Sequence, residues 1–253
     1  MDEAVFTVPV IAITGASDGL GRALALELAA PGVRLALNGR RPDRLASVAR
    51  DVAARGAQVL TVAGHVGDGA FADRLLATVG AEWGDITHLV TNASSLGTVP
   101  LRPMADVDDA GWEDAIATNL LGTVRLWRGV LPAMEERLGG GRLVAISSDA
   151  AVTPYAHWGP YGATKAAVDH LVAILAEEFR EHAVHGVDVY AVDPGDMDTA
   201  MHRAALPDDD PATLRDPQAS AVPIADLLMG PSRLPSGRYT VDDLTHRLRE
   251  VHG

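Results

Sequence analysis

The chain lacks several residue types and patterns that define whole classes of protein. No cysteine occurs among its 253 residues, which excludes disulfide bonds and thiolate metal sites. No run of eighteen apolar residues occurs either, so the sequence predicts no membrane span. Basic residues are few, since 21 Lys and Arg stand against 34 Asp and Glu and the formal net charge is −13. This charge disfavours nucleic acids and anionic membrane surfaces as partners.

Lysine is the scarcest charged residue, because Lys165 is the only one in the chain. Arginine is broad, planar and always charged, whereas lysine is compact and its pKa shifts readily. If the stretch is helical, Tyr161 and Lys165 share one face, one turn apart. A cation beside a phenol lowers a pKa that is about 10 when unperturbed, which makes Tyr161 a candidate proton donor and acceptor. A surface lysine near a core tyrosine is the alternative for this spacing alone.

Short apolar runs alternate with segments of helical periodicity through residue 192. Strands are predicted at residues 8–14, 33–38, 57–63, 86–91, 143–147 and 187–192, and helices at 20–30, 42–55, 70–83, 112–138 and 161–182. This alternation predicts an α/β fold with a parallel, doubly wound sheet. No linker divides the chain, so we expect one domain over residues 1–253.

The pattern loosens after Asp193. Residues 196–220 show little periodicity, and a segment of that length is typical of a lid or binding loop, so we predict a substrate loop there. A short helix is expected at residues 224–229, a last strand at 238–241, and a weak helical pattern over 242–252.

Three glycines join the first predicted strand to the first helix, at Gly15, Gly19 and Gly21. They let the backbone approach a pyrophosphate, and the helix amino terminus offers free N–H groups. A tight strand-to-helix connection is the simpler interpretation of the glycines alone. Their position after a first buried strand in a βαβ unit favours a dinucleotide site.

The second strand ends in Asn38-Gly39-Arg40-Arg41. A cofactor with a free ribose 2′-hydroxyl favours Asp or Glu near this point, and neither is present. Two arginines favour a 2′-phosphate, which prefers planar, multidentate donors. We therefore predict NADP(H) rather than NAD(H), although two solvated arginines at a helix start are an alternative.

These features occur in an order that resembles the short-chain dehydrogenase/reductase superfamily, in its short single-domain branch, over about residues 8–200. The glycine turn is similar to the family's cofactor turn, and Ser148 precedes Tyr161 by the usual thirteen residues. The other matches are Asn92-Ala93, Asn119 in Thr118-Asn119-Leu120, and Asp193-Pro194-Gly195 with Thr199. The resemblance implies a Rossmann-type sheet of about seven strands in the order 3-2-1-4-5-6-7.

The resemblance also implies a catalytic group of Asn119, Ser148, Tyr161 and Lys165 for reversible hydride transfer between nicotinamide C4 and a carbonyl or secondary alcohol carbon. Tyr161 exchanges the proton and Ser148 orients and polarises the carbonyl. Lys165 is expected to lower the pKa of Tyr161 and to bond the nicotinamide ribose. Asn119 is expected to hold a water that links Lys165 to solvent. The expected cofactor residues are Gly15, Ser17, Asp18, Gly19, Leu20, Gly21, Asn38, Arg40, Arg41, His65, Val66, Asn92, Ala93, Tyr161, Lys165, Pro194, Gly195, Met197 and Thr199.

Three positions depart from the family's pattern. His65 stands where many members have an aspartate that contacts adenine, and Ser94 replaces the glycine of the Asn-Ala-Gly motif. Asp18 lies just before the second glycine, where NADP enzymes often place a base. An acid there repels a 2′-phosphate unless Arg40 or Arg41 outweighs it.

The substrate is expected to be a small carbonyl or alcohol. The residues that flank the catalytic group could line an apolar pocket for an apolar or aromatic ketone, or could be ordinary core or interface residues; they are Leu96, Pro154, Tyr155, Trp158, Met197 and Met201. His182 and His185 lie three residues apart, but helix carboxyl termini favour histidine, so we predict no metal site.

Two other functions remain open. One is a cofactor-binding regulatory or scaffold protein without catalysis, against which the complete catalytic group argues. The other is an epimerase or dehydratase, for which about 60 residues after Pro194 leave little room. The acidic amino terminus, residues 1–4, is unlike a secretory signal, so a cytoplasmic protein is expected. The resemblance implies a homodimer or homotetramer packed through residues near 112–130 and 161–180.

Overall fold

Strands and helices alternate along the chain, and the computed structural model describes residues 8–184, 186–231, 233–242, 245 and 247–251. The strands are β1 Val10–Ile13, β2 Arg34–Gly39, β3 Gln58–Ala63, β4 His88–Thr91, β5 Gly141–Ile146, β6 Val187–Asp193, β7 Gly237–Val241 and β8 Leu248–Glu250. The α-helices are α1 Gly19–Glu27, α2 Pro42–Ala54, α3 Phe71–Trp83, α4 Asp109–Ala115, α5 Gly122–Glu136, α6 Gly159–Glu181, α7 Ala200–Ala205 and α8 Pro217–Met229. Residues 1–4 and His185 lie outside the described residues.

One sheet runs through the described part of the chain in the order β3-β2-β1-β4-β5-β6-β7-β8. All neighbouring pairs are parallel except β7 and β8, which are antiparallel. The predicted α/β fold and the order of its first seven strands are confirmed, and β8 extends the sheet by one edge strand. A weak helical pattern was expected where β8 lies; that prediction is wrong, because residues 248–250 pair with β7 instead.

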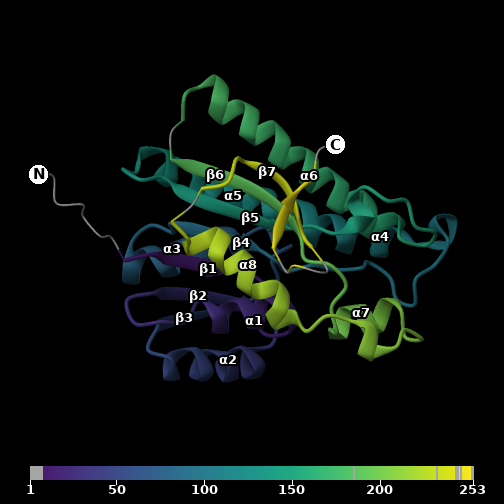
Figure 1. Cartoon of the computed structure of the whole chain (residues 1–253). Coiled ribbons are helices and arrows are strands. Elements are labelled where there is room, and N and C mark those ends of the chain that lie inside the picture. Colours follow the sequence, from purple (N-terminus) through teal and green to yellow (C-terminus); the bar gives the residue numbers. More distant parts are fainter. Residues whose placement is uncertain (1–7, 185, 232, 243–244, 246, 252–253) are drawn as a thin grey trace, which may run out of the picture.

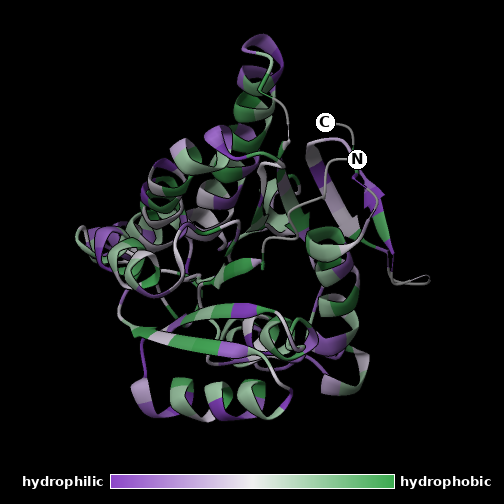
Figure 2. Ribbon diagram, turned by 90° about the vertical axis from the view of Figure 1, so that its left-hand side faces the viewer, coloured by the Kyte–Doolittle hydropathy of each residue, from purple (hydrophilic) through white to green (hydrophobic). Residues whose placement is uncertain are grey.

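Helices cover both faces of the sheet (Figure 1). Ile11 and Ile13 of β1 face a core that includes Leu24 of α1 and Leu228 of α8. The alternate residues of β1 face a second core, which includes residues of α3, α5 and α6, because successive side chains of a strand point to opposite faces. Figure 2 shows the hydrophobic colour concentrated on the strands and on the inner sides of the helices. Burial on both faces explains why the predicted strands are continuous apolar runs.

The long helix predicted at residues 112–138 is divided into three parts. A π-helical segment, Ile116–Leu121, separates α4 from α5. Pro132 lies inside α5, which nevertheless continues to Glu136. The helix therefore changes geometry at Asn119 rather than at the proline, and π-helical segments of this kind occur often at functional sites.

The predicted loop at residues 196–220 is partly helical, so the expectation of an irregular segment is corrected. It contains α7, a 3₁₀ turn at Pro211–Thr213 and the first turn of α8. Thr199 caps α7 and Asp216 caps α8, each with its side-chain oxygen. These helices are short or begin at proline, which left little periodicity for the sequence to reveal.

Within the described residues, no helix is both long and apolar enough to span a membrane.

Candidate active site

The site lies where the chain's connections diverge at the carboxyl ends of β1 and β4. These strands are neighbours, but β1 leads to β2 on one side and β4 leads to β5 on the other. Such a switch point opens a crevice in doubly wound sheets. A cavity of about 560 Å³ occupies it, and α7 lies beyond the same strand ends (Figure 1).

Nearly all of the predicted site residues line this one cavity. Gly21 and Asn119 are the two that do not. The predicted residues that line it are Gly15, Ser17, Asp18, Gly19, Leu20, Asn38, Arg40, Arg41, His65, Val66, Asn92, Ala93, Ser148, Tyr161, Lys165, Pro194, Gly195, Met197 and Thr199.

Close packing explains why Gly21 is glycine although it does not line the cavity. A Cβ on Gly21 would lie 2.4 Å from the main-chain oxygen of Gly15. Gly15 itself has a φ of +66°, in the left-handed region that favours glycine. Asn92 secures this turn, because its Nδ2 donates to the main-chain oxygen of Thr14 at 2.9 Å. The turn is thus held tightly against the end of β4.

An arginine cluster surrounds Asp18 at the amino terminus of α1. The Asp18 carboxylate accepts from the Gly19 N–H at 2.9 Å. It also lies 3.1 Å from Arg44 Nη1 and 3.5 Å from Arg41 Nη2. Within the described residues, Arg40 forms no ion pair, and it lines the cavity. Two guanidinium groups are therefore paired with the Asp18 carboxylate and Arg40 adds a third cation nearby, so the net charge of these four side chains is positive.

Asn38 and His65 hold the ends of β2 and β3 beside this arginine cluster. Asn38 Nδ2 donates to the main-chain oxygens of Val62 and Gly64, each at 3.0 Å. His65 Nδ1 accepts from the Gly67 N–H at 3.0 Å. Both side chains line the cavity while also fixing its wall.

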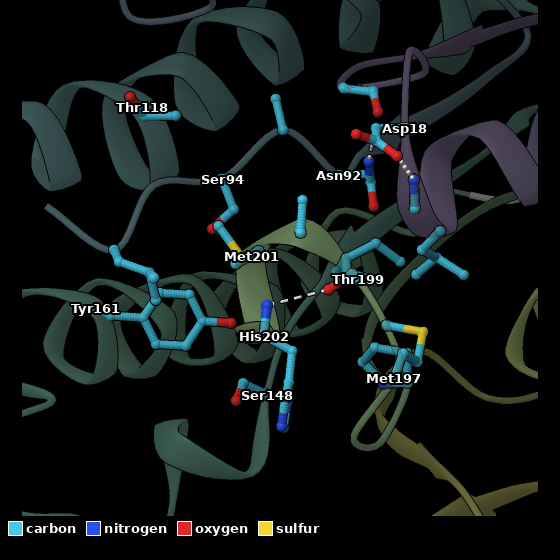
Figure 3. Close-up of a pocket in the computed structure, with 18 of the residues that line it drawn as sticks. Asp18, Asn92, Ser94, Thr118, Ser148, Tyr161, Met197, Thr199, Met201 and His202 are labelled. Carbon is cyan, nitrogen blue, oxygen red and sulfur yellow. Dashed lines mark hydrogen bonds between the residues drawn. The ribbon is translucent and has the colours of Figure 1, made fainter. Parts of the chain in front are cut away.

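Tyr161, Ser148 and Lys165 meet at the other end of the cavity. Tyr161 and Lys165 are both buried, and Lys165 Nζ lies 5.4 Å from the centroid of the Tyr161 ring. Lys165 Nζ donates to the main-chain oxygen of Ile146 at 2.6 Å. Figure 3 shows the Tyr161 hydroxyl pointing into the cavity, with Ser148 from the end of β5 and His202 from α7 beside it. The predicted spacing therefore does bring a phenol, a hydroxyl and an amine together.

The predicted lowering of the Tyr161 pKa is wrong for this structure. Burial raises the pKa of Tyr161 well above its usual value, a hydrogen bond with Ser148 opposes that rise, and the carboxylates of Asp193, Asp149 and Asp196 add to it. Burial also lowers the pKa of Lys165 to about 8, against the carboxylates of Asp169 and Asp193. Desolvation thus outweighs the attraction between ammonium and phenolate, and Tyr161 keeps its proton at neutral pH.

Asn119 lies in the π-helical segment and ties three elements together. Its Oδ1 accepts from Ser94 Oγ at 3.1 Å and from the Ser95 N–H at 2.7 Å. Its Nδ2 donates to the Ser95 main-chain oxygen and to Thr164 Oγ1, each at 2.9 Å. Both polar atoms of the side chain are therefore occupied by protein partners. Ser94, which departs from the family's glycine, supplies one of them.

The turn after β6 brings α7 against the glycine turn. Pro194 is fixed because its main-chain oxygen accepts from Ser220 Oγ at 2.7 Å. The Thr199 hydroxyl accepts from the His202 N–H at 3.1 Å and so begins α7. A Cβ on Gly19 would lie 3.1 Å from Thr199 Cγ2, so little space separates α7 from the turn.

Several lining residues are not among the predicted site residues, although Ser94 was noted as a departure from the family's pattern. They are Gly39, Gly64, Ser94, Thr118, Ile146, Ser147, Asp149, Ala150, Asp196, Ala200, His202, Ala205 and Leu206. Asp149 and Ala150 directly follow Ser148 at a strand end, and that adjacency was a usable signal. Of the α7 residues, Met201 was predicted to line the pocket, whereas Ala200, His202 and Ala205 were missed because no helix was predicted in their segment. Of the proposed pocket residues, Leu96, Tyr155, Trp158, Met197 and Met201 line the cavity and Pro154 does not.

No group of three or more His, Cys, Asp or Glu side chains that could hold a metal ion occurs in the described part of the chain.

Comparison with known proteins places this arrangement among related enzymes. Residues 9–210 match the family model for short chain dehydrogenases. The chain is 30% identical to the uncharacterized oxidoreductase YciK of Escherichia coli over 87% of its length and 86% of the relative. It is 35% identical to the NADP-dependent 3-hydroxy acid dehydrogenase YdfG of Salmonella typhi, over 71% and 70% of the two chains. The L-sorbose reductase of Gluconobacter frateurii, solved with NADPH and L-sorbose, superposes with a TM-score of 0.81 at 26% identity, over 93% and 95% of the two chains.

Proposed function

The chain belongs to the short-chain dehydrogenase family, and we propose that it interconverts a ketone and a secondary alcohol with NADP(H) as cofactor. One observation carries the proposal. Ser148, Tyr161 and Lys165 line a single cavity whose other end is formed by the glycine turn and Arg40. The chain is proposed to work as one domain over residues 1–253, with substrate entering beside α7.

The residues at the arginine end fit a phosphorylated dinucleotide. Free N–H groups at the amino terminus of α1 favour a pyrophosphate, and Gly15 and Gly19 keep the turn open to close approach. Arg40 and the paired Arg41 would hold a 2′-phosphate, which the planar guanidinium group suits. Asn92, Ala93 and the turn at Pro194 and Gly195 would line the nicotinamide half. A relative whose name records NADP dependence and a neighbour solved with NADPH support this choice.

The bound cofactor supplies the hydride, and the side chains of this chain manage the proton. Because burial keeps Tyr161 protonated, it is suited to donate its proton to the oxygen of a ketone as negative charge develops there. Ser148 shares a hydrogen bond with Tyr161 and orients the same oxygen. The ammonium of Lys165, 5.4 Å from the ring, stabilises the phenolate that remains.

Asn119 is proposed to act as a positioning residue. Its side chain fixes Ser94, Ser95 and Thr164, and Thr164 lies next to Lys165 on α6. A water held by Asn119, as the resemblance implies, has no free side-chain atom to bind.

Replacement of Tyr161 by Phe tests the function. Turnover of ketones with NADPH should fall at least about a thousandfold, in line with the loss of a proton donor and its hydrogen bond. Cofactor binding, followed by NADPH fluorescence, should stay within about twofold. Tyr239→Phe is the matched control, because its hydroxyl donates to the Pro235 main-chain oxygen, outside the cavity lining. Wild-type turnover in Tyr161→Phe would refute the mechanism. A wild type that prefers NADH would overturn the choice of cofactor, and one that binds neither NADPH nor NADH would favour a non-catalytic relative.

We also propose a homodimer or homotetramer packed through α4, α5 and α6. Ile116, Leu121 and Ile174 are exposed on this part of the molecule, and apolar side chains of this size favour burial against a partner. A monomer in sedimentation at working concentration contradicts the assembly without affecting the proposed reaction.

A further inference from the structure

Asp149 presents a fixed carboxylate to the cavity directly beside Ser148. Its Oδ1 accepts from Ser148 Oγ at 2.9 Å and from the Ala150 N–H at 2.8 Å. Its Oδ2 accepts from the Tyr155 hydroxyl at 2.7 Å. Both Asp149 and Tyr155 line the cavity. Hydrogen bonds to the charged form stabilise a carboxylate, so a negative charge is held in one place at the substrate end.

Two of the three Lys and Arg side chains among the described residues that line the cavity stand at its arginine end. Among the described residues that line it, the Lys and Arg side chains are Arg40 and Arg41 at the arginine end and Lys165. Lys165 is already bonded to the Ile146 main-chain oxygen below Tyr161. Arg238 lies beside Ser148 and donates to its main-chain oxygen at 3.0 Å, but its guanidinium is paired with Asp169 and Asp193. A substrate carboxylate near Ser148 would therefore meet the Asp149 carboxylate beside cations that already have partners, and like charges this close repel strongly.

The other walls of the substrate end suit a cation with an apolar body. The rings of Tyr155 and Trp158 line the cavity, and aromatic faces attract ammonium groups. Leu96 and Met201 line the same region and would contact the apolar remainder. The carboxylate of Asp149 therefore faces a mixed aromatic and aliphatic wall.

The hydrogen bond from Ser148 to Asp149 connects the Asp149 carboxylate to the proposed reduction of a ketone. A hydroxyl has one proton, and both Asp149 and Tyr161 compete for that of Ser148, so the proton is less available to a ketone oxygen. A substrate ammonium that bonds Asp149 replaces this donor and leaves Ser148 free to donate to the carbonyl. The same ammonium offsets the carboxylates that raise the pKa of Tyr161.

We propose that Asp149 is a specificity-determining residue that selects substrates carrying a protonated amine one or two carbons from the reacting carbon, and that rejects carboxylate substrates. The inference rests on the proposed function. In the oxidative direction, the carbinol C–H bond breaks and its hydride goes to NADP⁺. The O–H proton goes to the phenolate form of Tyr161, which burial makes the minor form at neutral pH, and the products are an amino ketone and NADPH.

Three alcohols of one skeleton test the proposal: 1-amino-2-propanol, 1,2-propanediol and 3-hydroxybutyrate. They share CH₃–CH(OH)–CH₂– and differ only in a cationic, neutral or anionic end at pH 7.5. With saturating NADP⁺, kcat/KM should fall in that order, with about 100-fold between amine and acid, as expected for unit charges near a fixed carboxylate. Asp149→Asn keeps the size and removes the charge, and the ratio should fall to about tenfold or less.

Asp51→Asn is the matched control, because Asp51 lies on α2, pairs with Arg22 and does not line the cavity. It should leave the ratio unchanged. Equal use of amine and acid by the wild type overturns the inference, as does an unchanged ratio in Asp149→Asn. If the wild type oxidises the neutral diol and Tyr161→Phe does not, the proposed function stands, whatever the ratio of kcat/KM between amine and acid. If no alcohol turns over, calorimetric binding to the NADP⁺ complex decides, and an amine bound no more tightly than the acid overturns the inference.

Discussion

The two ends of the cavity differ in how far their charged and polar side chains are exposed to solvent. At the arginine end, the side chains of Asp18 and Arg41 are 49% and 55% exposed, and the backbone of the glycine turn supplies much of the surface. At the tyrosine end, Tyr161 and Lys165 are only 8% and 4% exposed. Exposed charges are screened by water and salt and contribute modestly, whereas buried charges interact strongly and cost much to desolvate. Substitutions should therefore have large effects at the tyrosine end and small, separable effects at the arginine end.

The largest expected effect is that of Lys165→Met. Turnover should fall at least about a thousandfold, because the ammonium that stabilises the phenolate is lost. The same substitution should make the folded protein more stable, although it lowers turnover. Burial lowers the pKa of Lys165 from its ordinary value to about 8, so below pH 8 the folded state holds a charge that costs up to about 3 kcal/mol. Removing it should raise the free energy of unfolding, measured in urea at pH 7.

The direction of this stability effect can be checked by measuring the free energy of unfolding of both proteins at several pH values. Between about pH 8 and the ordinary pKa of the amine, the unfolded state binds more protons than the folded state, so wild-type stability gains with rising pH. The advantage of Lys165→Met should therefore shrink at pH 10. A variant less stable than wild type at pH 7 would show that the bond from Nζ to Ile146 outweighs desolvation.

The pH dependence of the rate of ketone reduction by the wild type should also show the titration of Lys165. The rate should be level near neutrality and fall above about pH 8, where Lys165 loses its proton, by about tenfold per pH unit at higher pH. Tyr161 adds no limb in this range, because burial keeps its pKa higher. Asp169→Asn removes a carboxylate that raises the pKa of Lys165, so the limb should move to lower pH. An unmoved limb would assign it to another group.

At the arginine end, Arg40→Ser should have an intermediate effect. Arg40 forms no ion pair within the described residues, so its guanidinium is available to a 2′-phosphate. The Kd for NADPH, from fluorescence titration, should rise by about tenfold, the value of one exposed charge-assisted contact. The Kd for NADH should hardly change. Arg50→Ser, an exposed position of α2 outside the cavity lining, controls for net charge, and equal losses for both cofactors would count against a 2′-phosphate site at Arg40.

The sequence predicted the elements whose chemistry is local. Buried strands such as Val187–Asp193 can be recognised in the sequence as apolar runs. The turn after β1 can be recognised by its glycines, such as Gly21, where a Cβ would clash with the backbone. The spacing of Tyr161 and Lys165 needs only one helical turn to bring them together. For these residues the neighbours in sequence are also the neighbours in space.

Features that depend on burial or on distant partners could not be predicted in this way. The direction of the Tyr161 pKa follows from desolvation inside the assembled cavity, which no spacing reveals. The partners of Asn119 come from a strand end and from α6, far along the chain. α7 has six residues, which are too few for a periodic pattern. β8 is a strand because it pairs with the edge strand β7, and this pairing partner cannot be read from the residues of β8 alone.

The smallest expected effect, and the sharpest test of the arginine end, is that of Asp18→Asn. The carboxylate lies 3.5 Å from Arg41 and 3.1 Å from Arg44, so it partly neutralises the cations that would face a 2′-phosphate. Asparagine is an equally good helix cap and can still accept from the Gly19 N–H, so the variant changes charge without removing the cap. NADPH affinity should rise by about two- to threefold at low salt and the gain should fade in 0.5 M salt, because exposed charges are screened. NADH affinity should stay constant. If NADPH affinity falls instead, Asp18 acts mainly by holding Arg41 and Arg44 in position, and the arginine end, like the tyrosine end, depends on coupled groups.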